Sequence, residues 1–494
     1  MKGFVVLFVA AIVTISIVIT YHNYFNITEI FKGFIHNDEE QIEINPKYKN
    51  TVKVDVFVDG LSFPTSMAFS DNNSILVVEK DSGNVRLVSN GVLQKDPIYT
   101  VKNISNEEEQ GLLGIAVLTN QISEKGKSSN DFSLNLSTSA ITGINRSSSS
   151  DRQITNFNYK VYLFFTEKIL GPNTSYDGLE GNSNNMTRNR VYEYDWSGND
   201  DDHLSNPKLL LDMPGLPGPY HNGGKIHVDN HGNLYTVIGD LVTINNILQN
   251  YPGGENKSIA IPNNSSVIMR VNPLVESLIP KDNPFYSSYF NNSILESAKF
   301  YYSYGIRNSF GMDTDPITGK LWNTENGENY YDEINLVSPG FNSGWYKIMG
   351  PVNRNNDTSI SDLISLKGSY YSDPEFSWRL PVGITDIEFL ESSTLGKDLE
   401  NNIFVGDINN GYLYFFKINS SRSGIDIYNS ILTNEKENEK GLEDLVADNK
   451  DELEKIIFAR GFNGRITDIE TGMDGNLYIL SYFDGKIYKI ASQT

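Results

Sequence analysis

The sequence predicts an all-β protein, a six-bladed β-propeller of four-stranded blades with a hydrophobic helix at its N-terminus. A strand–turn–strand–hairpin pattern recurs six times at a spacing of roughly 70–90 residues, which is long enough for a four-stranded sheet and its loops. Aromatic residues, mostly Tyr and Phe, make up 12% of the 494 residues, and strands favour such side chains. Asp, Asn and Gly gather in the turns between the apolar runs.

Each repeat contains three recognisable strands. The first strands are expected at 66–69, 112–118, 225–228, 310–313, 385–390 and 466–469. The second strands are expected at 75–78, 161–165, 234–238, 321–322, 403–405 and 477–480, and the third at 85–88, 191–194, 267–271, 334–337, 412–416 and 486–490. A ring of six sheets leaves only short, protected edges. A pair of packed sheets, as in a β-sandwich, is the alternative.

The N-terminal segment differs from the rest of the chain. An apolar run from Phe4 to Ile19 follows Lys2, longer than a usual signal-peptide core and slightly short for a membrane span. We expect residues 1–20 to be a signal or membrane anchor, 21–50 a linker and 51–494 the propeller. Abundant Asn-x-Ser/Thr sequons fit a location outside the cytoplasm, membrane-anchored or secreted, with membrane contact through this segment only.

Three polar segments interrupt the repeats and are interpreted as insertions, near 120–158, 171–188 and 434–455; the last has the charge pattern of a short exposed helix. The formal net charge of −22 argues against nucleic acid as a partner, because phosphate binding needs a basic surface. The chain has no cysteine, which excludes disulfides, thiolate metal sites and cysteine nucleophiles.

The loops that lead into the first strands should open together on one face of a propeller, around the central channel. Polar and cationic residues recur in these lead-in loops: Thr65, Glu109-Gln110, His221-Asn222, Arg307-Asn308, Arg379 and Arg465, with Lys225 nearby. Guanidinium groups bind carboxylates bidentately, so this cluster predicts a multiply charged anionic ligand. Salt bridges to acids at the blade edges are the alternative interpretation of the arginines.

Two segments suggest chemistry at this face. His221 is followed by Gly223 and Gly224, which leave room for a ligand beside an imidazole that could accept a proton from an alcohol. A purely structural histidine is the alternative. The segment 325–335 combines acids with turn residues whose carbonyls could bind Ca²⁺, although it lacks EF-hand spacing. An ordinary acidic turn is the alternative there.

These segments resemble, in one consistent order from about Val54 to Ile490, the soluble pyrroloquinoline-quinone-dependent glucose and aldose sugar dehydrogenases. The similarity rests on short motifs: Glu109-Gln-Gly-Leu-Leu-Gly-Ile115, His221-Asn-Gly-Gly-Lys225, Gly305-Ile-Arg-Asn-Ser-Phe-Gly311, Glu325-Asn-Gly-Glu328, Asp332-Glu-Ile-Asn-Leu336, Gly340-Phe-Asn-Ser-Gly-Trp345 and Arg465-Ile-Thr-Asp468. The resemblance implies a six-bladed propeller that holds the quinone and Ca²⁺ on the channel face.

The resemblance also implies roles for individual residues. His221 matches the base that removes the proton of the anomeric hydroxyl while hydride passes to quinone carbon C5. Arg307 and Asn308 match the pair beside the quinone carbonyls, where positive charge would stabilise a developing oxyanion. The main-chain carbonyls of Gly327 and Glu328 match those that hold the calcium ion.

The remaining matches concern cofactor binding. Arg465 matches an arginine that binds a quinone carboxylate, and Glu109 or Gln110 matches a polar residue at the cofactor edge. The chain departs from the family pattern at Thr467, where the family has a second arginine, and at Glu328, where it has proline. It also carries Tyr220 where glucose-specific members have an acid, and it lacks the His-Pro that usually follows the Gly-Leu-Leu-Gly strand. Arg379 or Lys225 would have to compensate for Thr467.

The sequence therefore favours an extracytoplasmic quinoprotein that oxidises the C1 hydroxyl of an aldose to the lactone and passes electrons to an acceptor that the sequence does not identify. Two alternatives stay open, because propellers of this kind also occur as binding modules. One is a non-catalytic cell-surface propeller that binds glycan or protein. The other is a lactone hydrolase with calcium in the channel.

Overall fold

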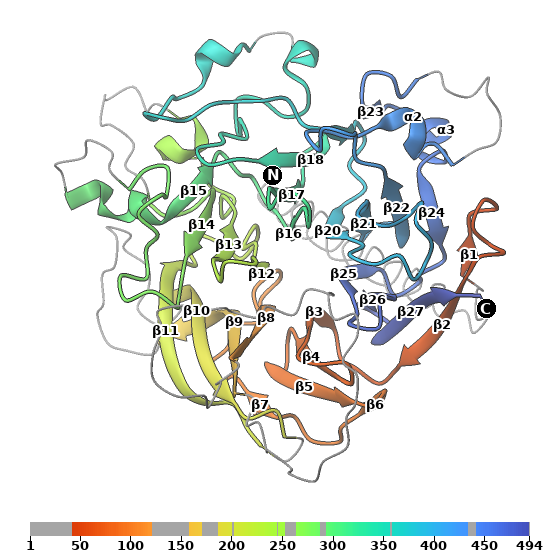
Figure 1. The fold of residues 1–494 in the computed structure, drawn as a ribbon. Helices are drawn as coiled ribbons and strands as arrows, with labels where there is room; N and C mark the ends of the chain where they lie inside the picture. The colour runs from red at the N-terminus through yellow and green to blue at the C-terminus, as the bar shows by residue number, and fades with distance from the viewer. Residues whose placement is uncertain are drawn as a thin grey trace, which may run out of the picture. The chain divides into compact units, whose positions relative to one another are not determined.

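The computed structural model describes residues 42–120, 158–169, 186–199, 202–244, 246–251, 263–286, 293–355, 358–432 and 441–493. These residues form six sheets arranged in a ring, antiparallel except for one short parallel pair at an outer edge (Figure 1). The expected anchor at 1–20, most of the expected linker at 21–50, most of the first two insertions and residues 434–440 of the third lie outside the described residues. Within the described ranges, no helix has both the length and the apolar character needed to cross a bilayer.

The blades follow one another in sequence order. Blade 1 contains β3 (Pro64–Phe69), β4 (Ser74–Glu79), β5 (Asn84–Ser89), β6 (Val92–Leu93) and β7 (Tyr99–Thr100). Blade 2 contains β8 (Leu112–Asn120), β9 (Asn158–Ile169), β10 (Met186–Trp196) and β11 (Ser205–Pro214). Blade 3 contains β12 (Ile226–Val228), β13 (Leu234–Ile238), β14 (Val267–Val271) and β15 (Tyr301–Tyr304).

The second half of the ring repeats this plan. Blade 4 contains β16 (Gly311–Thr314), β17 (Leu321–Glu325), β18 (Asp332–Val337) and β19 (Phe376–Trp378). Blade 5 contains β20 (Ile384–Phe389), β21 (Ile403–Asp407), β22 (Tyr412–Phe416) and β24 (Ile457–Arg460). Blade 6 contains β25 (Ile466–Thr471), β26 (Leu477–Ser481), β27 (Lys486–Ser492) and, as its outer strand, β2 (Val52–Val58).

The pairing of β2 with β27 closes the ring, because it joins the first long strand of the chain to the last one. Two further short strands lie on outer edges: β1 (Glu43–Ile44) pairs with β24, and β23 (Val446–Ala447) runs parallel to β19. Residues 43–44, within the segment expected to be a linker, thus belong to blade 5. The described part of the third insertion contains β23 and the four-residue helix α3 (Lys450–Leu453).

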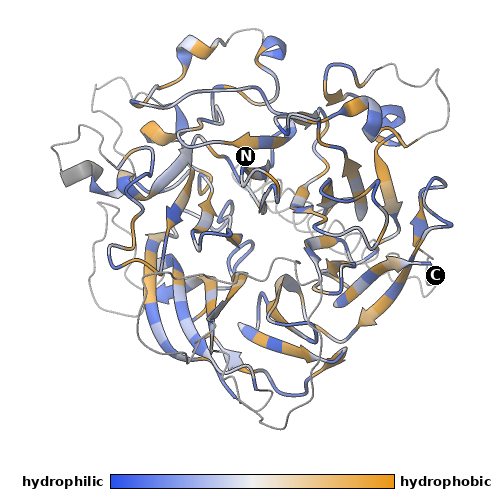
Figure 2. Cartoon of the chain, viewed as in Figure 1, coloured by the Kyte–Doolittle hydropathy of each residue, from blue (hydrophilic) through white to orange (hydrophobic). Residues whose placement is uncertain are grey.

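The other helices are short and lie in the connections: η1 (Ile247–Gln249), η2 (Ser293–Phe300), η3 (Val352–Arg354), η4 (Ile360–Asp362) and α2 (Ile427–Ser430). Every residue of β4, β13, β17 and β21 is buried, as expected for second strands that lie between two neighbouring sheets. Apolar residues concentrate on the strands and polar residues fill many of the turns (Figure 2). The core therefore runs as a belt around the ring.

The first strand of each blade lies nearest the axis, and these six strands contact one another in turn around it (Figure 1). The prediction of an all-β six-bladed propeller is confirmed, and all first, second and third strands lie where the repeat placed them. Because the first and second strands of a blade are antiparallel, each lead-in loop lies beside the loop that leaves the second strand. Both kinds of loop therefore form one face, whose centre we call the mouth.

Candidate active site

The backbone of blades 3 and 4 brings His221 and Arg307 together at the mouth. Gly239, which directly follows β13, lies between them: a Cβ on Gly239 would be 2.6 Å from the carbonyl oxygen of His221 and 2.4 Å from that of Arg307. The N–H of Asp240 donates a hydrogen bond to the same Arg307 carbonyl at 2.8 Å. Only a residue without a side chain allows the two lead-in loops to approach this closely.

The His221 imidazole is held by a carboxylate. Its Nδ1 lies 2.5 Å from Oδ1 of Asp240, and the indole Nε1–H of Trp345 donates to the other carboxylate oxygen at 2.8 Å. The Asp240 carboxylate accepts a hydrogen bond from Nδ1–H, which leaves the lone pair of the neutral imidazole on Nε2. Within the described part of the chain, Nε2 has no protein partner, and the side chain is 14% exposed. The imidazole is thus oriented to accept a proton from a molecule at the mouth.

The backbone of His221 itself adopts a left-handed conformation, with φ of 60°. This conformation is uncommon for residues other than glycine and costs free energy that the surrounding contacts must offset. The N–H of His221 donates to Oε2 of Glu109 at 2.7 Å, and the side-chain amide of Asn308 donates to the same oxygen at 3.1 Å. Glu109 of blade 2 therefore fixes the base of blade 3 and the amide of blade 4 in one arrangement.

Arg307 is anchored through its backbone, while its guanidinium forms no ion pair with any acid that the structure describes. Its N–H donates to Oε1 of the buried Glu325 at 2.7 Å, and one guanidinium nitrogen donates to the carbonyl of Asn326 at 3.1 Å. The guanidinium carbon lies 5.4 Å from the centre of the Trp345 ring. Burial raises the pKa of Glu325 to about 7, although the Arg307 N–H and the Ser343 hydroxyl both favour its ionised form.

The arginines of the described residues divide into two groups. Arg86, Arg188, Arg190, Arg270, Arg354, Arg379, Arg422 and Arg460 each form an ion pair with a carboxylate. Across the same ranges, Arg307 and Arg465 form none, and Arg465 donates instead to the carbonyl of Ile408 at 2.9 Å. Both belong to lead-in loops. In a chain with a net charge of −22, two arginines without an acidic partner indicate a place for an anionic ligand.

The loop expected to hold calcium is tightly curled. A Cβ on Gly327 would lie 2.0 Å from the carbonyl oxygen of Tyr330 and 2.5 Å from that of Tyr331, so several main-chain carbonyls gather within this short loop. Asp332 fastens the loop: one of its oxygens accepts the Gly327 N–H at 3.0 Å and the other accepts the Gly383 N–H at 2.7 Å. Carbonyl oxygens are ligands that Ca²⁺ accepts, so the loop offers the type of donor that the ion requires, and the assignment of the Gly327 and Glu328 carbonyls stays a prediction.

The mouth also fits a polar anionic cofactor. In the described structure, two buried atoms there, Nε of Arg307 and Oδ1 of Asn308, have no hydrogen-bond partner. Buried polar atoms are normally satisfied, and a bound molecule with polar edges would satisfy these. The residues present therefore fit the quinone that the resemblance implies.

Three residues that the sequence assigned to cofactor binding do not join this group. Gln110 is 3% exposed, and its amide bonds Ser105, Thr187 and the carbonyl of Gly215, so it holds blade 2 together. The side chain of Arg379 is 52% exposed at the end of β19, the fourth strand of blade 4, where it lies 3.7 Å from Asp448. The salt-bridge alternative therefore holds for Arg379.

Lys225 is the third predicted cofactor-binding residue whose side chain lies apart from this group. Its ammonium lies 2.8 Å from Asp386, 2.6 Å from Asp468 and 3.8 Å from Glu470. Burial alone would lower the pKa of Lys225, but the charges of Asp386 and Asp468 outweigh it and hold the pKa well above its usual range. Because this positive charge is neutralised by carboxylates, the prediction that Lys225 binds an anionic cofactor does not fit the geometry.

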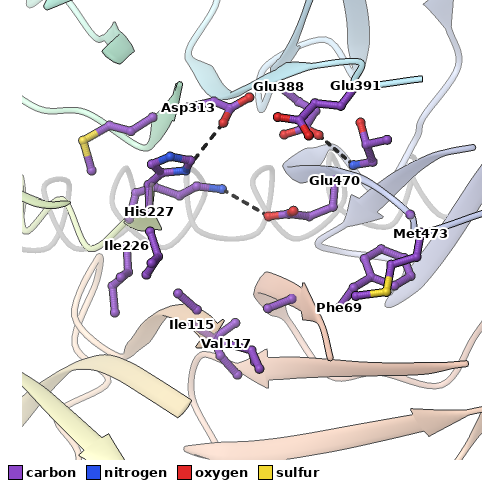
Figure 3. Close-up of a pocket in the computed structure, with 17 residues that line it drawn as sticks. Phe69, Ile115, Val117, Ile226, His227, Asp313, Glu388, Glu391, Glu470 and Met473 are labelled. Atoms are coloured by element: carbon purple, nitrogen blue, oxygen red, sulfur yellow. Dashed lines mark hydrogen bonds and ion pairs between the residues drawn. The ribbon is translucent and has the colours of Figure 1, made fainter. Parts of the chain in front are cut away.

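Lys225 is one of the residues that line an axial cavity of about 180 Å³, to which every blade contributes; Figure 3 shows this cavity with its lining side chains. Acidic side chains line it, among them Asp313, Glu388, Glu391 and Glu470. Burial raises the pKa of Glu470 to about 8 and that of Glu391 to about 7. The axis therefore carries cationic groups at the mouth and a largely acidic lining further along the first strands.

Sequence reasoning missed Gly239 and Asp240 and quoted Trp345 only within a motif. The signal for the first two was present: Gly239 and Asp240 come immediately after a buried second strand, and the loop that leaves such a strand lies on the same face as the lead-in loops. Nothing comparable in the local sequence indicates that the Trp345 indole turns toward Asp240.

Residues 155–489 match the family model described as glucose/sorbosone dehydrogenase. The chain is 24% identical over 290 residues to the aldose sugar dehydrogenase of Escherichia coli, covering 57% of this chain and 63% of that protein. It is also 24% identical over 306 residues to quinoprotein glucose dehydrogenase B of Acinetobacter calcoaceticus, covering 60% of this chain and 52% of that protein. The matched regions thus span less than two thirds of the length of these relatives.

Two solved structures share the fold. The soluble aldose sugar dehydrogenase from Escherichia coli in its apo form superposes with a TM-score of 0.57 at 20% identity, covering 90% of this chain and 100% of that one. The PQQ-bound form of the aldose sugar dehydrogenase from Streptomyces coelicolor superposes with a TM-score of 0.53 at 19% identity, covering 90% and 99%. These likenesses establish the propeller architecture.

Proposed function

The chain belongs to the glucose/sorbosone dehydrogenase family, and from that premise we propose that it oxidises the C1 hydroxyl of an aldose to the lactone with pyrroloquinoline quinone and Ca²⁺. One observation carries the proposal: the imidazole of His221, oriented by Asp240, shares the mouth with the guanidinium of Arg307, which forms no ion pair within the described residues and whose Nε has no hydrogen-bond partner there. A base and a cation side by side suit an oxidation in which the alcohol loses a proton and a hydride together.

Each of the residues at the mouth would have its own role in this reaction. Nε2 of His221 accepts the proton of the C1 hydroxyl, and Asp240 stabilises the imidazolium that forms. Arg307 and Asn308 place a positive charge and an amide where negative charge develops. The carbonyls of Gly327 and Glu328 would hold the calcium ion. When bound, the quinone supplies the two-electron acceptor for the hydride and the ion polarises it.

The substrate class and the fate of the electrons belong to the same proposal. The C1 carbon is oxidised by two electrons, the proton leaves through His221, and the electrons pass on to an external acceptor. Tyr220, which precedes the base, is 42% exposed and uncharged, so the rim beside the imidazole offers no carboxylate at that position for recognising one particular sugar. We therefore expect activity on several aldoses.

The test uses the full chain reconstituted with the quinone and Ca²⁺, and it follows reduction of an electron-accepting dye with a panel of aldoses. We expect reduction by the wild type, loss of it in His221→Ala and retention in His231→Ala, which changes a histidine in the turn between β12 and β13. Absence of dye reduction by the wild type, or equal rates in His221→Ala, would overturn the proposal.

A second candidate, a non-catalytic propeller at the cell surface, is favoured by one residue. The Thr467 hydroxyl donates to the carbonyl of Pro64 at 3.0 Å and brings no charge to the mouth, where the family has an arginine. Calorimetric titration with the quinone in the presence of Ca²⁺ separates the candidates, because only the enzyme requires binding. Both candidate functions include a location outside the cytoplasm. Mass spectrometry of the mature N-terminus tests whether residues 1–20 are retained.

A further inference from the structure

Trp345 differs from the other tryptophans of the chain in what its indole N–H does. The chain has four tryptophans, and the indole nitrogens of Trp196, Trp322 and Trp378 are buried with no hydrogen-bond partner in the described structure. Those three rings pack as apolar groups. Only the fourth donates its N–H, and the acceptor is the carboxylate that orients His221.

The backbone around Trp345 holds the ring in place. The Trp345 N–H donates to the carbonyl of Gly305 at 3.1 Å, and the side-chain amide of Asn250 donates to the Trp345 carbonyl at 2.8 Å. Asn250 and Asn342 also exchange two side-chain hydrogen bonds, at 2.8 Å and 2.9 Å. With its side chain 6% exposed, Trp345 is fixed by loops of blades 3 and 4 on both sides.

The ring contacts both halves of the candidate site. Its edge donates to Oδ2 of Asp240 at 2.8 Å, and its face lies under the Arg307 guanidinium, 5.4 Å from ring centre to guanidinium carbon. A cation over an indole face is attracted by the ring quadrupole. One rigid side chain therefore contacts the partner of the base and the cation at the same time.

We propose that Trp345 is a positioning residue that sets the orientation of the His221–Asp240 pair and of Arg307 through its indole N–H and its ring face. The inference rests on the proposed function for its catalytic meaning, but its structural content stands without it. Asp240 is 2% exposed, so loss of the indole donor leaves a buried carboxylate oxygen with one partner fewer. The carboxylate can then rotate away from Nδ1 of the imidazole.

Trp345→Phe separates the two contacts, because phenylalanine keeps a ring face for Arg307 and removes the N–H. The matched control is Trp196→Phe, which also trims a buried indole but one without a hydrogen-bond partner in the described structure. Thermal unfolding should therefore change little in the control, and Trp345→Phe should remain folded.

The first readout needs neither quinone nor sugar. In protein with ¹⁵N-labelled tryptophan and histidine, we expect the Trp345 indole signal to move with the same pH midpoint as the His221 imidazole, and the other three indole signals to stay still. In Trp345→Phe the midpoint of the His221 titration should fall, because a carboxylate that turns away from Nδ1 stabilises the imidazolium less. Trp196→Phe should leave it unchanged.

The second readout is kinetic. Trp345→Phe should lower kcat for aldose oxidation by roughly ten- to a hundred-fold, the effect of losing one hydrogen bond to a charged group, with KM nearly unchanged. An inactive wild type whose Trp345 signal still follows His221 would overturn the proposed function and leave the positioning role intact. A Trp345 signal in the wild type that ignores the His221 titration, or a variant with unchanged midpoint and kcat, would overturn the positioning role.

Discussion

Replacing Gly239 by alanine should force apart the two segments that carry His221 and Arg307. The new Cβ would stand 2.4 Å from the Arg307 carbonyl oxygen, 2.6 Å from that of His221 and 3.2 Å from Oδ1 of Asn308. Ordinary contact between carbon and oxygen begins near about 3.4 Å, so each carbonyl has to retreat by roughly 0.8–1 Å. Both clashes involve backbone atoms, which cannot escape by a change of rotamer.

The size of the effect follows from that displacement. Crowding a buried backbone position costs about 1–3 kcal/mol of unfolding free energy. A shift of about 1 Å between catalytic groups costs on the order of 100-fold in rate, because proton acceptor and cation no longer meet the same substrate atoms. We therefore expect Gly239→Ala to remain folded at 25 °C and to lose activity far beyond what its lower stability explains.

The assay compares thermal unfolding and dye reduction in wild type, Gly239→Ala and Gly472→Ala. The control places a Cβ 2.4 Å from a ring carbon of Tyr478, in the turn between β25 and β26, so it crowds a buried glycine away from the mouth. It should lose stability and keep its rate. Equal activity losses in the two variants, or full activity in Gly239→Ala, would refute the idea that Gly239 sets the spacing of the site.

Two further predictions concern charge. Asp240→Asn should lower kcat/KM for aldoses by roughly 10²- to 10⁴-fold while calorimetry still detects quinone binding, because a neutral amide neither fixes the imidazole tautomer nor stabilises the imidazolium; an active variant contradicts this role. Burial raises the pKa of Glu470 to about 8 and that of Glu391 to about 7, from 4.5, so the stability these groups contribute is present below pH 4.5 and lost as pH rises through 7 and 8. The melting temperature of the wild type should therefore fall from pH 5 to 8, and that of Glu470→Gln should fall less steeply. A wild-type melting temperature that stays constant over this pH range would contradict the prediction.

The fold could be predicted because a propeller repeats its hydrophobic pattern. Each second strand is buried on both faces, so a continuous apolar run followed by a Gly or Asn turn marks the centre of every blade. The outer strands escaped prediction because they share no common pattern: β15 is buried along its whole length and β11 is exposed over its first half. Blade 1 divides its outer edge between the two-residue strands β6 and β7. Ring closure by β2 also escaped, since pairing with β27 is set by tertiary geometry and not by any local signal.

The site was predictable to the extent that topology decides it. Antiparallel first and second strands put all lead-in loops on one face, so the position of His221, Arg307 and Glu109 in those loops was enough to bring them together. Side-chain direction is a finer property. Lys225 lies in the same segment as His221, yet its ammonium turns toward the carboxylates of the channel, which no pattern in that segment reveals.

The distribution of ion pairs explains why the mouth can accept an anion in so acidic a chain. Glu325 would be the natural partner of the Arg307 guanidinium, but its carboxylate accepts the Arg307 backbone N–H and the Ser343 hydroxyl instead. Glu109 likewise accepts a backbone N–H and an amide. The acids at the mouth are thus satisfied by neutral donors, and the guanidinium keeps its charge for a ligand. Further along the axis the reverse holds, because Lys225 is surrounded by carboxylates. Among the residues that the structure describes, it is therefore the mouth that combines an oriented base with an available positive charge.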